Sequence, residues 1–283
     1  MKMNKKKFDI SVIPMYAFLL AVLFLVIFPV IFEFVNSFKS NMEILAGMNF
    51  WPEKLSFDNY IQAWTVANFA KYTWNSVYYC FFNVSMALFF SAVNGYVFAR
   101  AEFPGKNVIF GIKTGMMFVT LGSSSMYPTL QILKALHLNT SLWGLIIMHF
   151  FGSSITNIFL VRSFIFSLPK EMDEAAEIDG CTFIGIFFRI IFPLLKPVMA
   201  TIGIISFQSS WNDYLMPMIV TLANPEQRTL PVGLKALAGS SDAAAAWNLV
   251  MAGAVISSLP MMIIYLFLNK YFVKGMTAGA VKG

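Results

Sequence analysis

Residues 174–197 read EAAEIDGCTFIGIFFRIIFPLLKP, and their character differs from that of the sequence on either side. Acidic side chains gather at the start of this segment, Gly180 follows them, and Pro193 and Pro197 stand near its end. The flanking stretches are long and apolar. If those stretches cross a membrane, the segment is a polar structure held at one membrane surface, so the fold depends on whether they do.

The composition indicates a membrane protein. The chain has 283 residues, of which 58% are hydrophobic and 12% are charged, whereas about a quarter of the residues in a soluble domain are charged. A membrane-spanning helix needs about 20 mainly apolar residues, and none of the apolar runs alternates as a barrel strand does. We therefore predict an all-α polytopic membrane protein with six transmembrane helices. The predicted spans are residues 10–32, 76–99, 107–125, 142–161, 198–223 and 247–268.

The basic residues set the predicted orientation, because Lys and Arg concentrate in cytoplasmic loops. With the N-terminus inside, 14 of the 20 Lys and Arg residues fall on the inner side. Both termini are therefore predicted to be cytoplasmic, with residues 1–9 as an N-terminal segment and 10–283 as a single domain. The first apolar run is longer than the core of a signal peptide, which favours an uncleaved anchor. The net charge of +6 reflects this orientation, and nucleic-acid binding is not expected.

We expect the segment after the fourth span to be a helix–turn–helix elbow on the cytoplasmic surface. Residues 171–178 contain strong helix formers and place acidic residues where the helix dipole favours them. Gly180 is free to adopt a positive φ and turn the chain. A second helix is expected from Thr182 to Phe192, because Pro193 blocks the backbone hydrogen bonding of the next turn.

The chemistry of this elbow favours a protein partner. A helix that only rests on lipid is typically basic, to suit anionic headgroups, and this one is acidic. Ala175 and Ala176 would form a small, smooth docking face, and the acidic side chains would pair with a basic groove. These acidic residues are Glu171, Asp173, Glu174, Glu177 and Asp179.

The segment resembles the EAA loop of importer-type ABC transporter permeases, whose pattern is roughly E-A-A-x-x-x-G followed nine residues later by I-x-L-P. Cys181 and Phe192 depart from the sugar-importer version, in which Ala and Leu are usual, and both changes stay apolar. Other stretches resemble the carbohydrate branch of the family, which includes the shorter maltose permease subunit. They are WNDYLMP (211–217), RTLPVGL (228–234) and YFVKGMTAGAVKG (271–283).

The resemblance implies that the elbow, residues 171–197, is a coupling helix held in a cleft of a separate ATPase subunit. Closure of two ATPase copies on ATP would then move the membrane helices between inward-open and outward-open states. The resemblance also implies a second, homologous permease chain, which would make a heterodimer, and an extracytoplasmic sugar-binding protein, in a bacterial cytoplasmic membrane. The residues to which it assigns ATPase coupling are Glu174, Ala175, Ala176, Asp179 and Gly180.

The sequence contains no phosphate loop of the form G-x-x-x-x-G-K-[ST]. ATP and Mg are therefore expected on the partner ATPase, and no cofactor is expected on this chain. No Ser/His/Asp set or pair of carboxylates predicts an enzyme. His137 and His149 lack the spacing of metal ligands, so no metal site is expected.

Polar residues near the end of the fifth span are the candidates for contact with a transported solute. An intramembrane carboxylate such as Asp213 is a functional candidate, although pairing or capping at the outer interface is the alternative. The candidate substrate-pathway residues are Gln208, Trp211, Asn212, Asp213 and Tyr214. Residues Gly239, Ser240 and Ser241 resemble the family's loop that probes the binding protein, and an exposed linker is the alternative there.

The predicted function is that of a permease subunit in an ATP-driven importer of a sugar or oligosaccharide. An importer permease for a non-sugar solute is one alternative. An ion-driven secondary transporter is another, and it would need more buried ionisable residues and an inverted repeat.

Overall fold

The computed structural model describes residues 13–47, 49–119, 122–151, 154–239 and 246–280. Every regular element within these ranges is a helix. The chain divides into two units, one formed by Met1–Phe69 with Leu234–Ile256 and the other by Ala70–Gly233 with Ser257–Gly283. Each unit has its own packing.

The first unit is organised by polar contacts around Asn59, which is buried. Its amide donates to the carbonyl oxygens of Ser37 and Lys39, both at 2.8 Å, and its side-chain oxygen accepts from Asn248 Nδ2 at 2.7 Å. These bonds hold the end of α1 and the start of α15 to α3. The helices of this unit are α1 (Ile13–Asn36), α2 (Asn41–Ala46), α3 (Asp58–Thr65) and the first turns of α15 (Trp247–Ala280).

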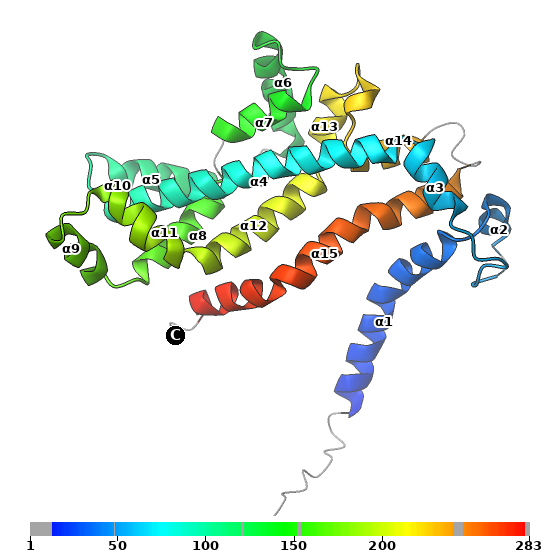
Figure 1. The fold of residues 1–283 in the computed structure, drawn as a ribbon, viewed down its shortest axis with the longest axis horizontal. Coiled ribbons are helices and arrows are strands. Elements are labelled where there is room, and N and C mark those ends of the chain that lie inside the picture. Colours follow the sequence, from blue (N-terminus) through cyan, green and yellow to red (C-terminus); the bar gives the residue numbers. More distant parts are fainter. Residues whose placement is uncertain (1–12, 48, 120–121, 152–153, 240–245, 281–283) are drawn as a thin grey trace, which may run out of the picture. The chain divides into compact units, whose positions relative to one another are not determined.

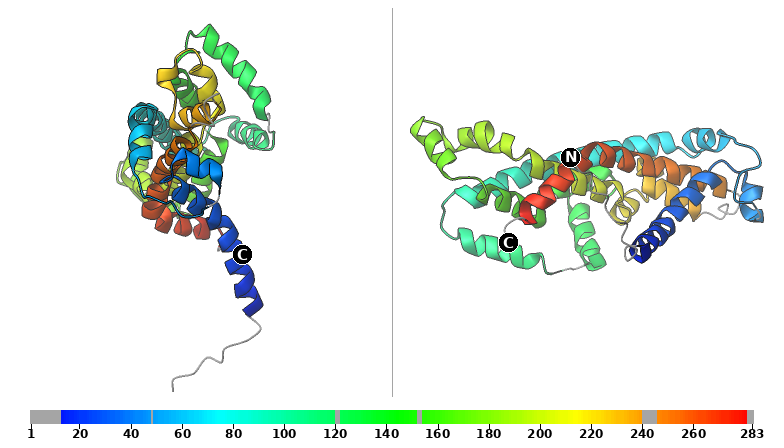
Figure 2. Two further views of the ribbon diagram at one scale, coloured as in Figure 1. Left: turned by 90° about the vertical axis from the view of Figure 1, so that its right-hand side faces the viewer. Right: turned by 90° about the horizontal axis from the view of Figure 1, so that it is seen from below.

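The second unit contains the long helix α4 (Phe69–Arg100) and the elbow. Helices α4 and α12 run side by side (Figures 1 and 2), and a Cβ at Gly203 of α12 would lie 3.9 Å from Leu88 of α4. A buried apolar cluster joins α4, α8, the elbow and α12. The remaining elements of this unit are α5 (Lys106–Met116), η2 (Gly122–Ser125), α6 (Met126–Ala135), α7 (Leu142–Phe151), α8 (Ile155–Phe166), α9 (Glu171–Ile178), α10 (Phe183–Ile186), η3 (Phe187–Ile191), α11 (Phe192–Leu194), α12 (Lys196–Trp211), α13 (Leu215–Val220), η4 (Pro225–Gln227) and α15 from Ser257 on. Helix α14 (Leu230–Ala238) belongs to this unit up to Gly233 and to the first unit from Leu234.

Several helices are long and apolar enough to cross a membrane. They are α1, α4, the stretch Leu142–Phe166 that contains α7 and α8, and Trp247–Phe267 of α15. The pair Phe183–Leu194 and Lys196–Trp211 also passes this test when taken together, although it bends by 75° between the two parts. These findings confirm an all-helical protein with several apolar spans.

The predicted third span, residues 107–125, is not matched by one long helix in the described part of the chain. Helix α5 has 11 residues and ends at Met116, a length of about 16 Å against a hydrocarbon layer of about 30 Å. Helix α12 likewise ends at Trp211, well before residue 223, and α13 begins anew at Leu215. The count of six spans therefore stays a prediction.

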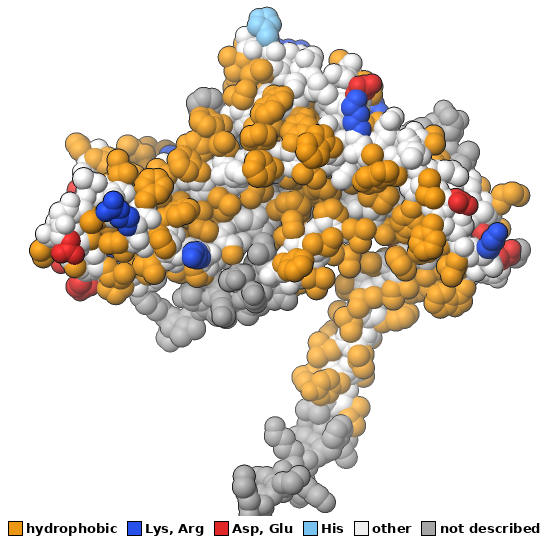
Figure 3. Space-filling model, in the orientation of Figure 1, with side chains coloured by type: hydrophobic (Ala, Val, Ile, Leu, Met, Phe, Trp, Pro, Cys, Tyr) orange, Lys and Arg blue, Asp and Glu red, His pale blue; other side chains and the backbone are white. Residues whose placement is uncertain are grey.

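The surface of the helices fits a lipid environment. Hydrophobic side chains cover α1 and most of the visible face of the second unit in Figure 3. Only 6% of the most apolar window of α1 is buried by the chain itself. Acidic side chains gather instead at the end of the second unit where α9 lies.

Candidate functional site

The elbow has the backbone that its sequence predicts at its first helix and turn. Helix α9 covers Glu171–Ile178, and Gly180 adopts a φ of 80°. The backbone N–H of Cys181 donates to the carbonyl of Ala176 at 2.9 Å, which closes the end of the helix over the glycine. The Thr182 hydroxyl then accepts from Gly185 N–H at 3.2 Å and starts the next helix.

The second arm of the elbow differs from the prediction. It continues past Phe192 to Leu194. Within it, Phe187–Ile191 form a π-helical turn, η3, between two short α-helical pieces. Pro193 therefore falls in the first turn of α11, directly after the π-helical turn. After this arm the chain bends by 75° into α12.

Helix α9 turns one side toward the rest of its unit. Ala176 is buried in the apolar cluster, and Asp173 is 7% exposed. An Asp173 carboxylate oxygen lies 2.6 Å from Arg100 Nε at the end of α4, and the Arg100 guanidinium also donates to the Leu168 carbonyl at 3.2 Å. Asp173 and Ala176 therefore share the side of α9 that faces the rest of the unit, because residues three apart lie on one side of a helix.

The opposite side of α9 is open. Glu174, Ala175, Asp179 and Gly180 are exposed, and Ile178 is 87% exposed. Of the residues assigned to ATPase coupling, only Ala176 is covered by the chain itself. The elbow thus combines a buried side, fixed to α4 by an ion pair, with an exposed side that carries carboxylates around an isoleucine.

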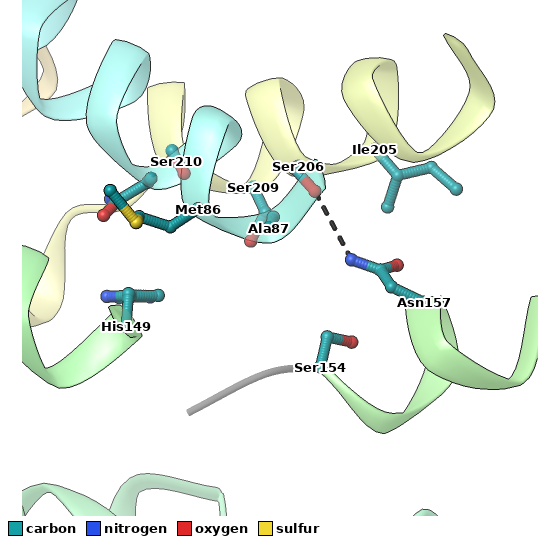
Figure 4. A pocket seen from close by; sticks show the side chains of 10 residues that line it. Met86, Ala87, His149, Ser154, Asn157, Ile205, Ser206, Ser209 and Ser210 are labelled. Carbon is teal, nitrogen blue, oxygen red and sulfur yellow. Dashed lines mark hydrogen bonds between the residues drawn. The ribbon is translucent and has the colours of Figure 1, made fainter. Parts of the chain in front are cut away.

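A polar cavity of about 300 Å³ lies between α4, α8 and α12, with His149 of α7 at one side (Figure 4). Asn157 of α8 donates to the Ser206 hydroxyl of α12 at 3.5 Å across it. Asn83 of α4 is 4% exposed, and neither polar atom of its side chain has a hydrogen-bond partner. Ser209 and other hydroxyl groups complete the lining, so the cavity offers donors and acceptors in an otherwise apolar bundle.

Asp213 lines a neighbouring cavity of about 560 Å³. The Tyr79 hydroxyl, on a fully buried ring of α4, donates to an Asp213 carboxylate oxygen at 2.8 Å. His149 borders both cavities, and its Nδ1 lies 2.8 Å from the Leu145 carbonyl. Within the described residues no cluster of three or more His, Cys, Asp or Glu side chains suits a metal ion.

The other predicted pathway residues do not border these cavities. Trp211 is buried, donates from its indole N–H to the Ser257 carbonyl at 2.9 Å and stacks on Phe207, which gives it a packing role. Gln208 and Asn212 are exposed, and Tyr214 is half-buried. Gly239 is exposed, while Ser240 and Ser241 lie outside the described residues.

Sequence reasoning missed Asn83 and Asn157. Each stands inside an apolar run and is buried in the second unit. The signal was available, because a strongly polar side chain within a membrane run is a functional candidate in the same way as Asp213.

The whole sequence places the chain among known proteins. Residues 2–278 match the family of binding-protein-dependent transport system inner membrane components. The chain belongs to this family. It is thus a multi-pass component of a binding-protein-dependent transport system in the cytoplasmic membrane, and the predicted family of importer-type permeases is confirmed.

Individual relatives cover nearly the full length. The arabinooligosaccharides transport system permease protein AraQ of Bacillus subtilis is 35% identical over 99% of this chain and 99% of its own. The melibiose/raffinose/stachyose import permease protein MelC of the same organism is 35% identical, over 82% of this chain and 83% of its own. A chain from the crystal structure of a bacterial ABC transporter involved in the import of the acidic polysaccharide alginate is 26% identical. It superposes with a TM-score of 0.81 over 95% of this chain and all of that one.

Proposed function

We propose that this chain is the transmembrane permease subunit of an ATP-driven importer that brings a sugar or oligosaccharide into the cell. The sugars named for the relatives AraQ and MelC support a carbohydrate as the solute. In this proposal residues 10–283 form one permease domain with six spans and both termini in the cytoplasm. A non-sugar solute is the alternative.

The observation that carries the coupling part of this proposal is the buried contact between Arg100 and Asp173. It fixes the elbow to α4, the helix that also lines the polar cavity at Asn83. Asn83 and Arg100 are separated by about 25 Å along the helix axis. A partner that moves the exposed side of α9 therefore moves one wall of the cavity.

Membership of the binding-protein-dependent transport family supports a set of partners. A second, homologous permease would complete a heterodimer, two ATPase copies would grip the elbows, and an extracytoplasmic sugar-binding protein would deliver the solute. ATP and Mg would be held by the ATPase, which hydrolyses ATP, and this chain would carry no cofactor. Glu174, Ala175, Asp179 and Gly180 would contact the ATPase directly, while Ala176 would support the helix from below.

The solute would rest in the polar cavity. Asn83, Asn157 and Ser206 line it, and their amide and hydroxyl groups are hydrogen-bond donors and acceptors that match those of a sugar. Asp213 and His149 would contribute from the adjoining space, in line with the predicted role of Asp213. Gln208 and Asn212, which are exposed, would remain available to the second permease.

Reconstitution of the complete transporter tests this proposal. Proteoliposomes containing both permeases, the ATPases and the binding protein are expected to accumulate labelled oligosaccharide when ATP is supplied. The variant Glu174→Lys is expected to insert normally but to lose uptake while ATP hydrolysis continues. Glu102→Lys is the matched control, because Glu102 is an exposed carboxylate outside the elbow, paired with Lys106 at 3.2 Å. Full uptake by Glu174→Lys would contradict the coupling role.

The orientation is tested separately. A cysteine placed at the exposed position Glu177, in a chain with Cys80 and Cys181 replaced by Ala, should react with an impermeant maleimide only from the cytoplasmic side. Labelling in intact cells would place the elbow outside and reject the proposal.

A further inference from the structure

Aromatic side chains form a row at the N-terminal end of α4. Trp74, Tyr78 and Phe82 follow one another at four-residue spacing, which places them on one face of the helix. Trp143, at the start of α7, lies against them with its ring centroid 6.0 Å from that of Tyr78 and 5.0 Å from that of Phe82. The Tyr78 and Trp143 rings are stacked at 20°. We call Trp74, Tyr78, Phe82 and Trp143 the aromatic row.

The aromatic row borders two cavities that continue toward the polar cavity. The first has a volume of about 370 Å³ and is lined by the whole row together with Ser141 and Gln227. The second, of about 360 Å³, shares Phe82 and Trp143 with the first and has an entirely apolar lining. Met86 lines this second cavity and also the polar cavity. Shared side chains thus connect Trp74 with Met86, at the edge of the polar cavity, over about 18 Å of helix.

The lining of the first cavity combines flat aromatic faces with an unused acceptor. The side-chain oxygen of Gln227 is buried and has no hydrogen-bond partner. A lipid chain in this cavity would leave that oxygen unpaired, which is unfavourable. A sugar ring presents C–H groups on its faces and hydroxyl groups around its rim, so it suits both the flat rings and the amide side chain of Gln227 that lines the same cavity. Tryptophan and tyrosine suit such a ligand, because each joins a large apolar face to a polar group.

We propose that the aromatic row is a carbohydrate-stacking surface that guides an oligosaccharide between the N-terminal end of α4 and the polar cavity. The surface is distinct from the polar cavity, since it holds rings by their faces while the cavity holds hydroxyl groups. This inference rests on the proposed function, and it adds that chains of several sugar units gain more from the surface than a single unit does.

The test compares uptake of labelled mono-, di- and tetrasaccharides by the reconstituted transporter. The variant Trp143→Leu keeps an apolar side chain but removes the flat ring. At sugar concentrations below saturation, uptake of the tetrasaccharide is expected to fall about tenfold, the equivalent of about 1.4 kcal/mol of lost stacking. Uptake of the monosaccharide is expected to fall much less. Trp143→Phe should restore most of the tetrasaccharide uptake.

Trp51→Leu is the matched control, because Trp51 is also an exposed tryptophan but belongs to the first unit and is not part of the aromatic row. An equal loss in Trp51→Leu, or equal losses for all sugar lengths in Trp143→Leu, would show membrane anchoring and overturn the inference. Quenching of the Trp143 fluorescence by brominated lipids, unchanged by sugar and binding protein, would show a lipid groove and overturn it as well. If wild-type vesicles accumulate no sugar, the proposed function fails; if only the length dependence is missing, this inference alone fails.

Discussion

The two ends of α4 each carry one ion pair, and the two pairs differ in burial. At the C-terminal end, Arg100 Nε and Asp173 lie 2.6 Å apart, with side chains 9% and 10% exposed. At the N-terminal end, Lys71 and Glu226 lie 2.5 Å apart, with side chains 50% and 76% exposed. The atoms are equally close at both ends, so distance alone does not rank these contacts.

Burial changes what each pair does. Removal of one partner from a buried pair leaves an unpaired charge in a medium of low dielectric constant. Water and salt screen the exposed pair, whose contribution is small. The segment around Glu226 is held instead by uncharged contacts. Asn75 Nδ2 donates to the carbonyls of Glu226 and Arg228 at 2.8 and 2.9 Å. The ion pair is therefore structural at the elbow and dispensable at the other end.

The sharpest test of this contrast removes one carboxylate at each end. Asp173→Ala is expected to destabilise the protein by about 3–5 kcal/mol, because Arg100 stays buried without its partner. Glu226→Ala should leave the midpoint of thermal unfolding in detergent unchanged within error. The double variant Arg100→Met/Asp173→Leu should recover much of the lost stability. Equal effects of the two single variants would refute the contrast.

The close contact between α4 and α8 near Arg100 should not tolerate a larger side chain. A Cβ at Gly95 of α4 would lie 2.5 Å from Val161 Cγ1 of α8, so Gly95→Ala is expected to destabilise by about 1–3 kcal/mol. The matched control is Gly203→Ala, where the nearest atom is 3.9 Å away and a helical alanine is favourable. Rescue of Gly95→Ala by Val161→Ala, measured by the same thermal unfolding, would assign the effect to this contact. An unchanged unfolding midpoint in Gly95→Ala would show that α4 and α8 can move apart at little cost and would contradict this prediction.

Replacement of Gly180 in the turn of the elbow should strain the backbone. Gly180 has a φ of 80° and no atom near the position of a Cβ, so Gly180→Val introduces backbone strain of about 1–2 kcal/mol without a clash. Co-purification with the ATPase is expected to fall. Gly105→Val places the same strain at φ 81°, also in open space, in the turn after α4. Unchanged co-purification of Gly180→Val, or an equal fall for Gly105→Val, would argue against a specific role of this turn.

The smallest expected effect is a pH dependence at the exposed pair. The hydrogen bond and charge of Lys71 lower the pKa of Glu226 below its ordinary value of 4.5. A carboxyl whose pKa is lower in the folded state stabilises above its unfolded pKa and loses this contribution as the pH falls through the folded pKa. Below pH 4.5, the thermal unfolding midpoint of Lys71→Met should fall less steeply with decreasing pH than that of the wild type. Added salt should reduce the pH dependence of the wild type in the same way. A steeper acid loss in the variant would contradict the assignment.

Local features of the elbow were predictable from its sequence, and its tertiary contacts were not. Acidic and alanine residues followed by a glycine define α9 and its turn, because these preferences act over a few residues. The partner of Asp173 lies on α4, far away in the sequence, so no local pattern distinguishes Asp173 from the exposed Glu174. The π-helical turn before Pro193 has no local sequence pattern that predicts it, and it carries the buried side chains of Phe187 and Ile191.

The polar cavity shows the same division. Asp213 was predictable because a carboxylate in an apolar run is conspicuous. Trp211, two residues earlier, is a pathway candidate in the sequence because it flanks Asp213 and its ring suits stacking. Its indole is instead taken up by the Ser257 carbonyl of α15, and α12 is too evenly apolar for its sequence to show which side faces a neighbouring helix. That Asn83 lines the cavity could not be predicted from the sequence, because the cavity exists only where α4, α8 and α12 pack together.

The 75° angle between Phe183–Leu194 and α12 makes these two helical segments the arms of a bent lever. Leu195, at the corner, is fully buried, so the angle is set by packing and both arms turn together. The arms measure about 18 and 24 Å, from about 1.5 Å per residue. If the two arms rotate together about Leu195, a displacement at Phe183 tilts α12. Because α12 is the longer arm, its end at Trp211, near Asp213 in the sequence, moves about one third farther than Phe183 does.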